Sequence, residues 1–375
     1  EETLFFALRS GRNDGHRYIN ELYARGVQNF VVSTLPQDCA QRYPDANFLL
    51  VLDTLEALQR LAERHRDEFN IPIVGITGSN GKTMVKEWLN QILSGDFMVT
   101  RSPRSYNSQV GVPLSVWLLD RHSQVGIFEA GISKPGEMLA LRNIIQPTIA
   151  VLTNIGDAHQ ENFASREAKC MEKLQLFHDA QVVVYNGDDV LVKHCVSEQH
   201  DLHAEQLFWS CADAAAPFYI NKVEKSGAAT LVTYRYAGET NSYRLPFIDE
   251  ASISNSFACA LVALKLGIGP DTLAQRMAQL EPIAMRLEVK EGQHGCTLIN
   301  DSYNSDINAL DIALDFMNRR PDHQGRRHTL ILSDIFQSGL TPDALYREVG
   351  TLCRQRGIEK FIGIGRELCA HALSI

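Results

Sequence analysis

The stretch that decides the fold is Ile-Pro-Ile-Val-Gly-Ile-Thr-Gly-Ser-Asn-Gly-Lys-Thr, residues 71–83. The apolar, β-branched run 71–77 predicts a buried strand, and the amphipathic residues 82–93 predict a helix. Glycines between them let the backbone approach a phosphate without Cβ clashes, and the helix start directs N–H groups toward an anion. The stretch therefore predicts a phosphate-binding loop.

The residue types in this loop suit ATP with Mg²⁺. Lys82 can reach the β- and γ-phosphates, and the Thr83 hydroxyl can hold the metal ion. The general P-loop pattern would place Gly at position 76, where Ile stands. A Gly-rich strand–helix turn without a ligand is the alternative, and Gly-Lys-Thr between an apolar strand and a helix argues against it. The expected nucleotide contacts are Gly78, Ser79, Asn80, Gly81, Lys82 and Thr83.

The composition is that of a globular protein, with 45% hydrophobic and 22% charged residues. A length of 375 residues predicts two or three domains. The formal net charge of -9 disfavours extended contact with nucleic acid, whose binders are usually basic. Eight cysteines without a CxxC pair favour reduced thiols, and no apolar run approaches the ~20 residues of a membrane span. We therefore expect a cytoplasmic protein.

The order of the predicted elements indicates an α/β protein with three domains, 1–69, 70–282 and 283–375. In the first domain, an apolar stripe on the helix 54–68 needs a sheet to cover it. In the second, parallel strands alternate with helices before antiparallel hairpins appear over 218–248. In the third, the alternation of strands and helices predicts another doubly wound unit. The chain lacks an initiator Met and stops within a predicted helix, so we expect a fragment with both terminal domains incomplete.

The shorter form of the loop, Thr-Gly-Ser-Asn-Gly-Lys-Thr over 77–83, resembles the P-loop of Mur ligases and folylpolyglutamate synthases. Further matches to Mur ligases follow in the right order along nearly the whole chain. The resemblance implies the three-domain Mur ligase architecture, with a central P-loop parallel-sheet ATPase domain and a C-terminal Rossmann-like domain.

The resemblance also implies a set of metal-binding residues. Glu129 ends an apolar strand, so its carboxylate lies in the ligand crevice, although a solvent-facing strand end is the alternative. His159 closes a Thr-Asn-x-x-x-x-His motif and is favoured over Asp157 as a ligand of a second Mg²⁺. Lys173, in Lys-Leu-Gln-Leu-Phe, matches a lysine that is often carbamylated in relatives. The alternatives are an ordinary helix-surface lysine at 173, or Lys169 in its place.

Residues beyond the phosphate loop resemble the family's adenine and ribose contacts. These expected nucleotide contacts are Asn255, Arg286, Asp301, Tyr303 and Asn304.

The match departs from the family pattern at three places. Ala251-Ser252 replaces the His-Asn that precedes the adenine-binding Asn, and Asp306-Ile307 replaces an Asn-Pro. The segment 332–337 lacks the Glu of a Gly-Asp-Met-x-Glu-Leu motif. These departures resemble the Bacteroidetes version, in which the ligase is fused ahead of an alanine racemase, and we therefore expect such a fusion beyond Ile375.

Two segments resemble the substrate side of one branch of the family. Residues 4–16 resemble the Leu-Phe-x-Ala…Asp-Gly-His block of a uridine-nucleotide domain. Asn107 and Ser108 open an Asn-x-x-Gly-Val-Pro segment that lines the nucleotide-sugar site in relatives. That branch joins D-alanyl-D-alanine to UDP-N-acetylmuramoyl-tripeptide, and these two molecules are the expected substrates.

The implied reaction is ADP-forming amide ligation through an acyl phosphate, for which Lys82, Glu129, His159 and Lys173 are the expected catalytic residues. Three alternatives remain open. The chain could be another amide ligase of the superfamily, such as a different Mur enzyme or a folylpolyglutamate or cyanophycin-type synthetase. It could be an unrelated P-loop ATPase or kinase, or a nucleotide-binding partner without catalysis.

Overall fold

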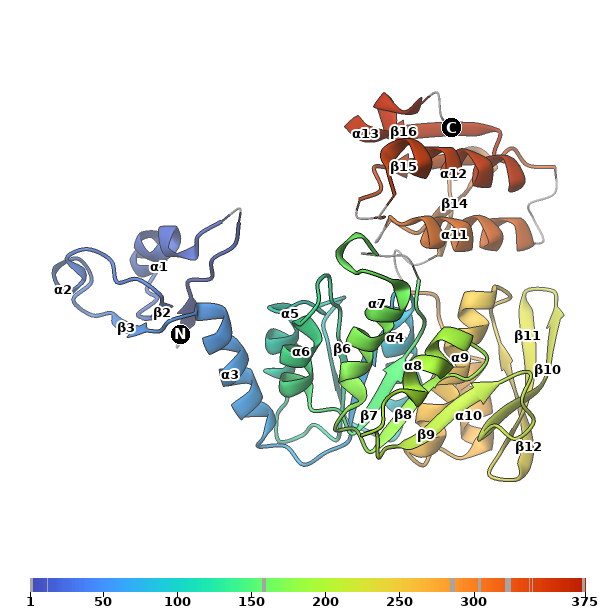
Figure 1. Cartoon of the computed structure of the whole chain (residues 1–375), viewed down its shortest axis with the longest axis horizontal. Helices are drawn as coiled ribbons and strands as arrows, with labels where there is room; N and C mark the ends of the chain where they lie inside the picture. The colour runs from blue at the N-terminus through green and yellow to red at the C-terminus, as the bar shows by residue number, and fades with distance from the viewer. Residues whose placement is uncertain are drawn as a thin grey trace.

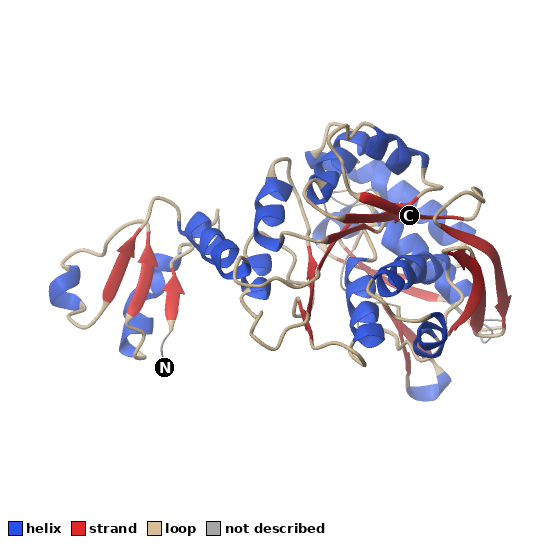
Figure 2. Cartoon of the chain, turned by 90° about the horizontal axis from the view of Figure 1, so that it is seen from below, coloured by secondary structure: helices blue, strands red, loops and turns tan. Residues whose placement is uncertain are grey.

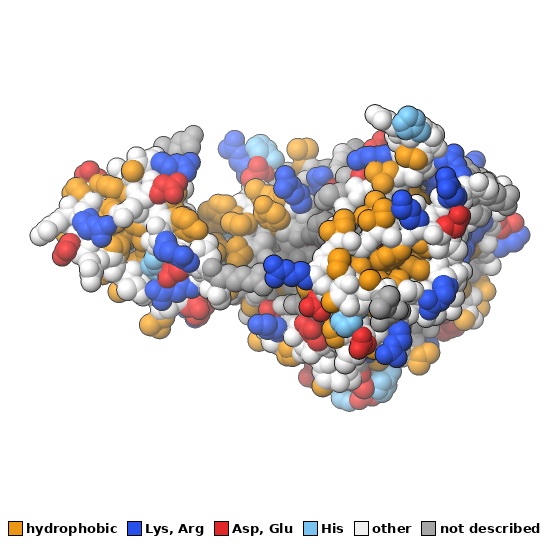
Figure 3. All heavy atoms as spheres, turned by 90° about the horizontal axis from the view of Figure 1, so that it is seen from above, with side chains coloured by type: hydrophobic (Ala, Val, Ile, Leu, Met, Phe, Trp, Pro, Cys, Tyr) orange, Lys and Arg blue, Asp and Glu red, His pale blue; other side chains and the backbone are white. Residues whose placement is uncertain are grey.

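The computed structural model describes residues 3–11, 13–156, 160–283, 287–302, 305–320, 325–336, 338, 340–372 and 375. Three parts follow one another along the chain, and Figures 1 and 2 show the N-terminal part as a separate lobe. The same lobe stands apart in the space-filling view of Figure 3. Within the described residues, no helix combines the length and the apolar character needed to span a bilayer.

The N-terminal lobe contains a three-stranded parallel sheet in the order β1-β2-β3. Its small core forms around Phe30, which stacks on Phe48 with ring centroids 5.2 Å apart. Its elements are β1 (Leu4–Phe6), η1 (Gly15–Tyr18), α1 (Ile19–Ala24), β2 (Asn29–Val32), α2 (Cys39–Arg42) and β3 (Asn47–Leu50).

Helix α3 (Thr54–Arg66) leads from this lobe to the central part. Asp53 caps its N-terminus by accepting hydrogen bonds from the backbone N–H groups of Leu55 and Glu56. The expectation that a sheet covers its apolar stripe is wrong. The helix packs mainly on α5 and α6, where Ala62 joins the central core, because those short helices cover the sheet and offer their own apolar faces.

The central part is a nine-stranded sheet in the order β12-β11-β10-β9-β8-β7-β4-β6-β5. The seven neighbouring strands β5, β6, β4, β7, β8, β9 and β10 pair in parallel. Strands β10, β11 and β12 form the expected antiparallel hairpins. The strands are β4 (Ile73–Thr77), β5 (Val99–Arg101), β6 (Val125–Glu129), β7 (Ile149–Leu152), β8 (Val182–Asn186), β9 (Glu205–Ser210), β10 (Phe218–Ser226), β11 (Ala229–Tyr236) and β12 (Glu239–Leu245).

Helices cover both faces of this sheet and form two apolar cores. One core contains side chains of α4, α9 and α10, and the other contains those of α5, α6, α7 and α8. The carboxyl ends of the parallel strands therefore open between the two helical layers. The helices are α4 (Lys82–Leu93), α5 (Gly111–Val116), α6 (Glu137–Ile145), η2 (Gln160–Asn162), α7 (Arg166–Leu174), η3 (Gln175–Phe177), α8 (Val190–Ser197), α9 (Glu250–Lys265) and α10 (Pro270–Met277).

The C-terminal part lies above the carboxyl end of the central sheet in Figure 1. Strands β15 and β16 pair in parallel, whereas β13 and β14 form an antiparallel pair that the sequence pattern did not predict. A core around Leu314, Tyr346 and Val349 holds the helices on the sheet. Its elements are β13 (Glu288–Glu291), η4 (Gln293–Gly295), β14 (Thr297–Asn300), α11 (Ile307–Arg319), β15 (Thr329–Ser333), α12 (Pro342–Gln355), β16 (Lys360–Ile364) and α13 (Arg366–Ala370).

Candidate nucleotide and metal site

The predicted phosphate loop connects the buried strand β4 to the N-terminus of α4. Gly78 and Gly81 have φ values of 142° and 84°, which L side chains rarely adopt. A Cβ atom at Gly78 would lie 1.9 Å from the Thr153 hydroxyl, and one at Gly81 would lie 2.5 Å from Oδ1 of Asn255. Both glycines are therefore required by the backbone conformation and by the neighbouring side chains.

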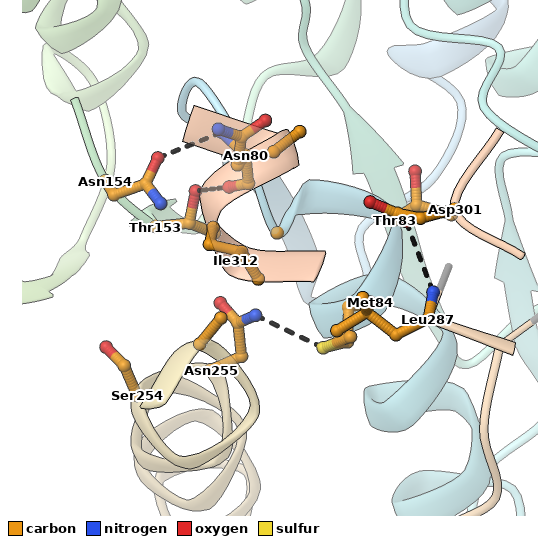
Figure 4. Close-up of a pocket in the computed structure, with 13 residues that line it drawn as sticks. Asn80, Thr83, Met84, Thr153, Asn154, Ser254, Asn255, Leu287, Asp301 and Ile312 are labelled. Atoms are coloured by element: carbon orange, nitrogen blue, oxygen red, sulfur yellow. Dashed lines mark hydrogen bonds between the residues drawn. The ribbon is translucent and has the colours of Figure 1, made fainter. Parts of the chain in front are cut away.

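The chain that follows β7 holds the loop in shape, as Figure 4 shows for Thr153 and Asn154. The backbone N–H of Ser79 donates to the Asn154 carbonyl at 2.9 Å, and that of Asn80 donates to Asn154 Oδ1 at 2.9 Å. The Thr153 hydroxyl donates to the Asn80 carbonyl at 2.5 Å. Thr153 and Asn154 are the first two residues of the Thr-Asn-x-x-x-x-His motif, and that pattern did not predict their role in shaping the loop.

Lys82, the first residue of α4, lies over the loop. Its Nζ donates to the carbonyls of Gly78 at 2.7 Å and Ser79 at 3.0 Å. The first N–H groups of α4 have no acceptor within the helix. A cation and a helix N-terminus thus converge at the loop, which is the arrangement that binds a phosphate.

Glu129 is fully buried at the end of β6, so the alternative of a solvent-facing residue is wrong. Its Oε2 accepts a hydrogen bond from the Thr83 hydroxyl at 3.1 Å, and Thr83 also contacts the Ser105 hydroxyl at 2.9 Å. No described donor directs a hydrogen bond at Oε1 of Glu129, although an ammonium group lies at ion-pair distance. Buried oxygen atoms with a lone pair to spare fit a hard cation such as Mg²⁺.

That ammonium group belongs to Lys86, which the sequence analysis missed. Lys86 is fully buried, and its Nζ lies 3.1 Å from Glu129 Oε1 and 3.0 Å from Glu87 Oε1. The signal was present in its position, because Lys86 follows Lys82 by four residues and so lies on the same face of α4.

Lys173 and Lys169 approach the loop from α7. Both are buried, at 4% and 1% exposure, so the alternative of an ordinary helix-surface lysine is wrong. Nζ of Lys173 donates to the Gly78 carbonyl at 3.1 Å, and that of Lys169 donates to the Gly156 carbonyl. Burial, followed by the positive charges of Lys82 and Lys169, holds the pKa of Lys173 well below its usual range.

A cavity of about 640 Å³, counting its open mouth, lies between the phosphate loop, α9 and the C-terminal part. Asn255 and Asp301 line it from opposite sides, as Figure 4 shows. Asn255 Nδ2 contacts the Met84 sulfur at 3.2 Å, and Asp301 Oδ1 accepts from the backbone N–H of Leu287 at 3.2 Å. The two expected nucleotide contacts therefore face one cavity.

Asn107 and Ser108 lie in the segment between β5 and α5. The Asn107 carbonyl accepts from the N–H of Gly131 at 2.8 Å, and its amide nitrogen lies 3.5 Å from Glu129 Oε2. Ser108 Oγ accepts from the N–H of Gly111 at 3.1 Å. The structure thus brings the expected substrate segment to the expected metal carboxylate.

Some expected site residues lie outside the described part of the chain, namely His159, Arg286, Tyr303 and Asn304. Among the residues that are described, no group of three His, Cys, Asp or Glu side chains is placed to hold a metal ion. The described candidate ligands are Thr83, Glu129 and Lys173.

The Asp-Gly-His block of the N-terminal lobe has a local structural role. Asp14 Oδ1 lies 2.6 Å from His16 Nδ1, and His16 Nε2 accepts from the backbone N–H of Ser33 at 3.1 Å. The backbone and ring N–H groups of His16 lower the pKa of Asp14. A Cβ atom at Gly15 would lie 2.8 Å from backbone atoms of Ala7, so the block ties η1 to the ends of β1 and β2.

The family model of the Mur ligase middle domain matches residues 76–263, which begin within β4 and end within α9. The chain belongs to the Mur ligase family. A UDP-N-acetylmuramoyl-tripeptide–D-alanyl-D-alanine ligase of Bacillus subtilis is 26% identical over 371 residues, which cover 98% of this chain and 78% of that protein.

Solved Mur ligase structures share the fold of this chain. MurF from Acinetobacter baumannii superposes with a TM-score of 0.84 at 23% identity, covering 98% of this chain and 79% of that one. MurF from Thermotoga maritima in complex with ADP gives a TM-score of 0.81 at 22% identity, covering 98% and 86%. The expected three-domain Mur ligase architecture is thereby confirmed.

Proposed function

We propose that this Mur ligase joins D-alanyl-D-alanine to UDP-N-acetylmuramoyl-tripeptide, with conversion of ATP to ADP and phosphate. The observation that carries the proposal is the similarity over nearly the whole chain to ligases named for this reaction. The cluster of Lys82, Thr83 and Glu129 supports it, because these residue types bind ATP and Mg²⁺. The reaction belongs in the cytoplasm, and the fused racemase domain stays a prediction.

The reaction has two steps. An oxygen of the terminal carboxylate of the tripeptide attacks the γ-phosphorus of ATP, and the bond to the ADP oxygen breaks. The amine of D-alanyl-D-alanine then attacks the acyl carbon of the resulting acyl phosphate. The bond between that carbon and the bridging phosphate oxygen breaks, phosphate leaves, and the amine loses one proton. Phosphorylation is needed because a free carboxylate has no adequate leaving group.

The protein contributes charge and position rather than covalent chemistry. Lys82, which already bridges two loop carbonyls, would turn its ammonium to the transferring phosphoryl group. Thr83 and Glu129 would hold a Mg²⁺ ion, which supplies charge neutralisation for the phosphate oxygens. Removal of this local positive charge would slow phosphoryl transfer more than it weakens nucleotide binding.

Lys173 would become a ligand of a second Mg²⁺ ion after carbamylation. Its neutral amine attacks carbon dioxide, the new N–C bond forms, and one proton is released to leave a negatively charged carbamate. The lowered pKa of Lys173 supports this step, because only the neutral amine is nucleophilic. His159 would share that metal ion, and the tripeptide carboxylate would be held beside the γ-phosphate.

The cavity between the central and C-terminal parts would take the nucleoside of ATP. Asn255 would contact the adenine, and Asp301 the ribose, since both line this cavity. Arg286, Tyr303 and Asn304 would complete the same site. Asn107 and Ser108 would contact the UDP-muramoyl moiety close to Glu129.

The proposal is tested by the identity of the product. The protein is incubated with ATP, Mg²⁺ and UDP-muramoyl-tripeptide, and D-alanyl-D-alanine, D-alanine, L-lysine or L-glutamate is offered as the amine. Of the four amines, only D-alanyl-D-alanine is expected to give a product by mass spectrometry, and that product is the UDP-muramoyl-pentapeptide. A product with another amine, or with a shorter UDP-muramoyl acceptor, would instead assign the chain to a different ligation step.

A further inference from the structure

We propose that Lys86 is a positioning residue that couples the metal carboxylate Glu129 to the segment 102–107, so that metal binding and acceptor binding depend on one another. The proposal rests on the proposed function for the identity of the acceptor. Its structural basis is independent of that identity, because it lies in the contacts of one buried ammonium group.

Lys86 contacts both elements at once. Its Nζ lies 3.1 Å from Glu129 Oε1 and also donates to the carbonyls of Ser102, at 2.9 Å, and Arg104. A fully buried ammonium is costly unless it is paired and hydrogen-bonded, and these partners fulfil both conditions. Since the partners come from different segments, a shift of either one is felt by the other through Lys86.

The segment 102–107 is held in an unusual shape at the point that Lys86 contacts. Arg104 has a φ of 50°, in the left-handed region that non-glycine residues rarely occupy. Such a conformation persists only when its surroundings enforce it, and it is most often found at functional sites. The hydrogen bond from Lys86 to the Arg104 carbonyl is one of the contacts that enforce it.

The same segment carries three side chains that contact Glu129 or its partner Thr83. Ser102 Oγ accepts from the backbone N–H of Glu129 at 3.3 Å. Ser105 Oγ contacts Thr83 Oγ1 at 2.9 Å, and Asn107 Nδ2 lies 3.5 Å from Glu129 Oε2. A change in the backbone of this segment would therefore move the hydroxyl and amide groups around Glu129.

Removal of the Lys86 ammonium should have two consequences at once. Glu129 would lose the cation that holds Oε1, so the carboxylate would be free to turn away from Thr83. The carbonyls of Ser102 and Arg104 would lose their shared donor, so the segment that carries Asn107 would relax. A residue with only a packing role would not link these two effects.

The test compares Lys86→Met with a control, Arg101→Met. Arg101 donates to Glu87 at 3.0 Å, so its removal takes a cation from the same cluster without a contact to Glu129. The binding of Mn²⁺ in the presence of ADP is measured by electron paramagnetic resonance, and the binding of UDP-muramoyl-tripeptide by calorimetry. The binding of ADP alone, in the presence of a chelator, reports whether the loop remains intact.

For Lys86→Met, we expect both the Mn²⁺ and the acceptor dissociation constants to rise by about 10-fold or more, as for other partners of metal ligands. ADP binding without metal should change less than about twofold, and Arg101→Met should resemble the wild type in all three. Acceptor affinity in the wild type should also increase when Mn²⁺ and ADP are present, and this gain should disappear in Lys86→Met.

Two results would overturn the proposal. One is a folded Lys86→Met protein whose Mn²⁺ and acceptor affinities both match the wild type, and the other is a loss of only one of them. If Lys86→Met does not fold, Lys86→Gln is measured in its place, because it keeps a donor for the Ser102 carbonyl but removes the charge. Lys86→Gln should weaken the binding of Mn²⁺ more than the binding of the acceptor. If the wild type binds Mn²⁺ with ADP but not this acceptor, the proposed function fails, and the coupling fails with it.

Discussion

Two buried lysines on opposite sides of the phosphate loop differ in what surrounds them. Lys86, on α4, has the carboxylates of Glu87 and Glu129 at 3.0 and 3.1 Å. Lys173, on α7, contacts the Gly78 carbonyl, and among the described residues no carboxylate lies within ion-pair distance of it. Burial is similar in both cases, so the charged partners decide the chemistry that each lysine can perform.

The difference separates two uses of one residue type. A buried lysine next to carboxylates serves as a fixed cation that orients them. A buried lysine next to other cations is driven toward the neutral amine, which is the form that reacts with carbon dioxide. Lys82 lies between the two sides, over the loop itself, and is expected to act directly on the phosphates.

The largest effect is expected for Lys82→Ala. Loss of a positioned charge that stabilises a transition state typically costs 10²–10³-fold, so we expect kcat for phosphate release to fall by about that factor. Circular dichroism and the melting temperature should stay close to those of the wild type, because Lys82 is only partly buried. A variant that kept more than about one tenth of the wild-type kcat would remove Lys82 from the chemistry.

The second prediction separates Lys173 from Lys86. For Lys173→Ala, we expect kcat to fall by about 100-fold and to recover in part when acetate or propionate is added, because a small carboxylate can replace the carbamate. Lys86→Ala should not respond to either acid, since it lacks a cation. A ¹³C resonance of a lysine carbamate should appear in labelled bicarbonate for the wild type and disappear in Lys173→Ala. Equal behaviour of the two variants would contradict the comparison.

The third and smallest effect concerns how the free energy of unfolding depends on pH in buffers free of carbon dioxide. The folded protein holds the pKa of Lys173 below the value of 10.5 that applies in the unfolded chain. Between the two values the unfolded state binds one proton more, so stability rises with pH, by at most about 1.4 kcal/mol per unit. Urea unfolding at several pH values should give a smaller rise for Lys173→Met, and identical slopes would contradict the lowered pKa.

Much of the fold could be predicted from local pattern. The phosphate loop, β4 and α4 were readable because glycine, lysine and apolar residues occur in a fixed order along a short segment. Strand β9 and helices α5 and α10 were not predicted. Their short runs have weak periodicity, and they form because the large sheet and its helices bury them.

The site residues at strand ends could be predicted from the sequence, whereas those whose role depends on packing could not. Glu129 was found because it ends an apolar strand. Lys86 was missed because a lysine within a helix ordinarily lies on the surface, and only the fold shows that this one is enclosed by Glu129 and the segment 102–107. The left-handed backbone at Arg104 also has no signature in its residue type.

The ligase reaction is tested most directly by following the oxygen of the acceptor. The terminal carboxylate of UDP-muramoyl-tripeptide is labelled with ¹⁸O, and the phosphate released in the presence of ATP, Mg²⁺ and D-alanyl-D-alanine is analysed by mass spectrometry. Attack of the carboxylate on the γ-phosphorus, followed by attack of the amine on the acyl carbon, predicts one ¹⁸O atom in each phosphate and one pentapeptide formed with it. Release of unlabelled phosphate, or release at the same rate without the dipeptide, would contradict the account.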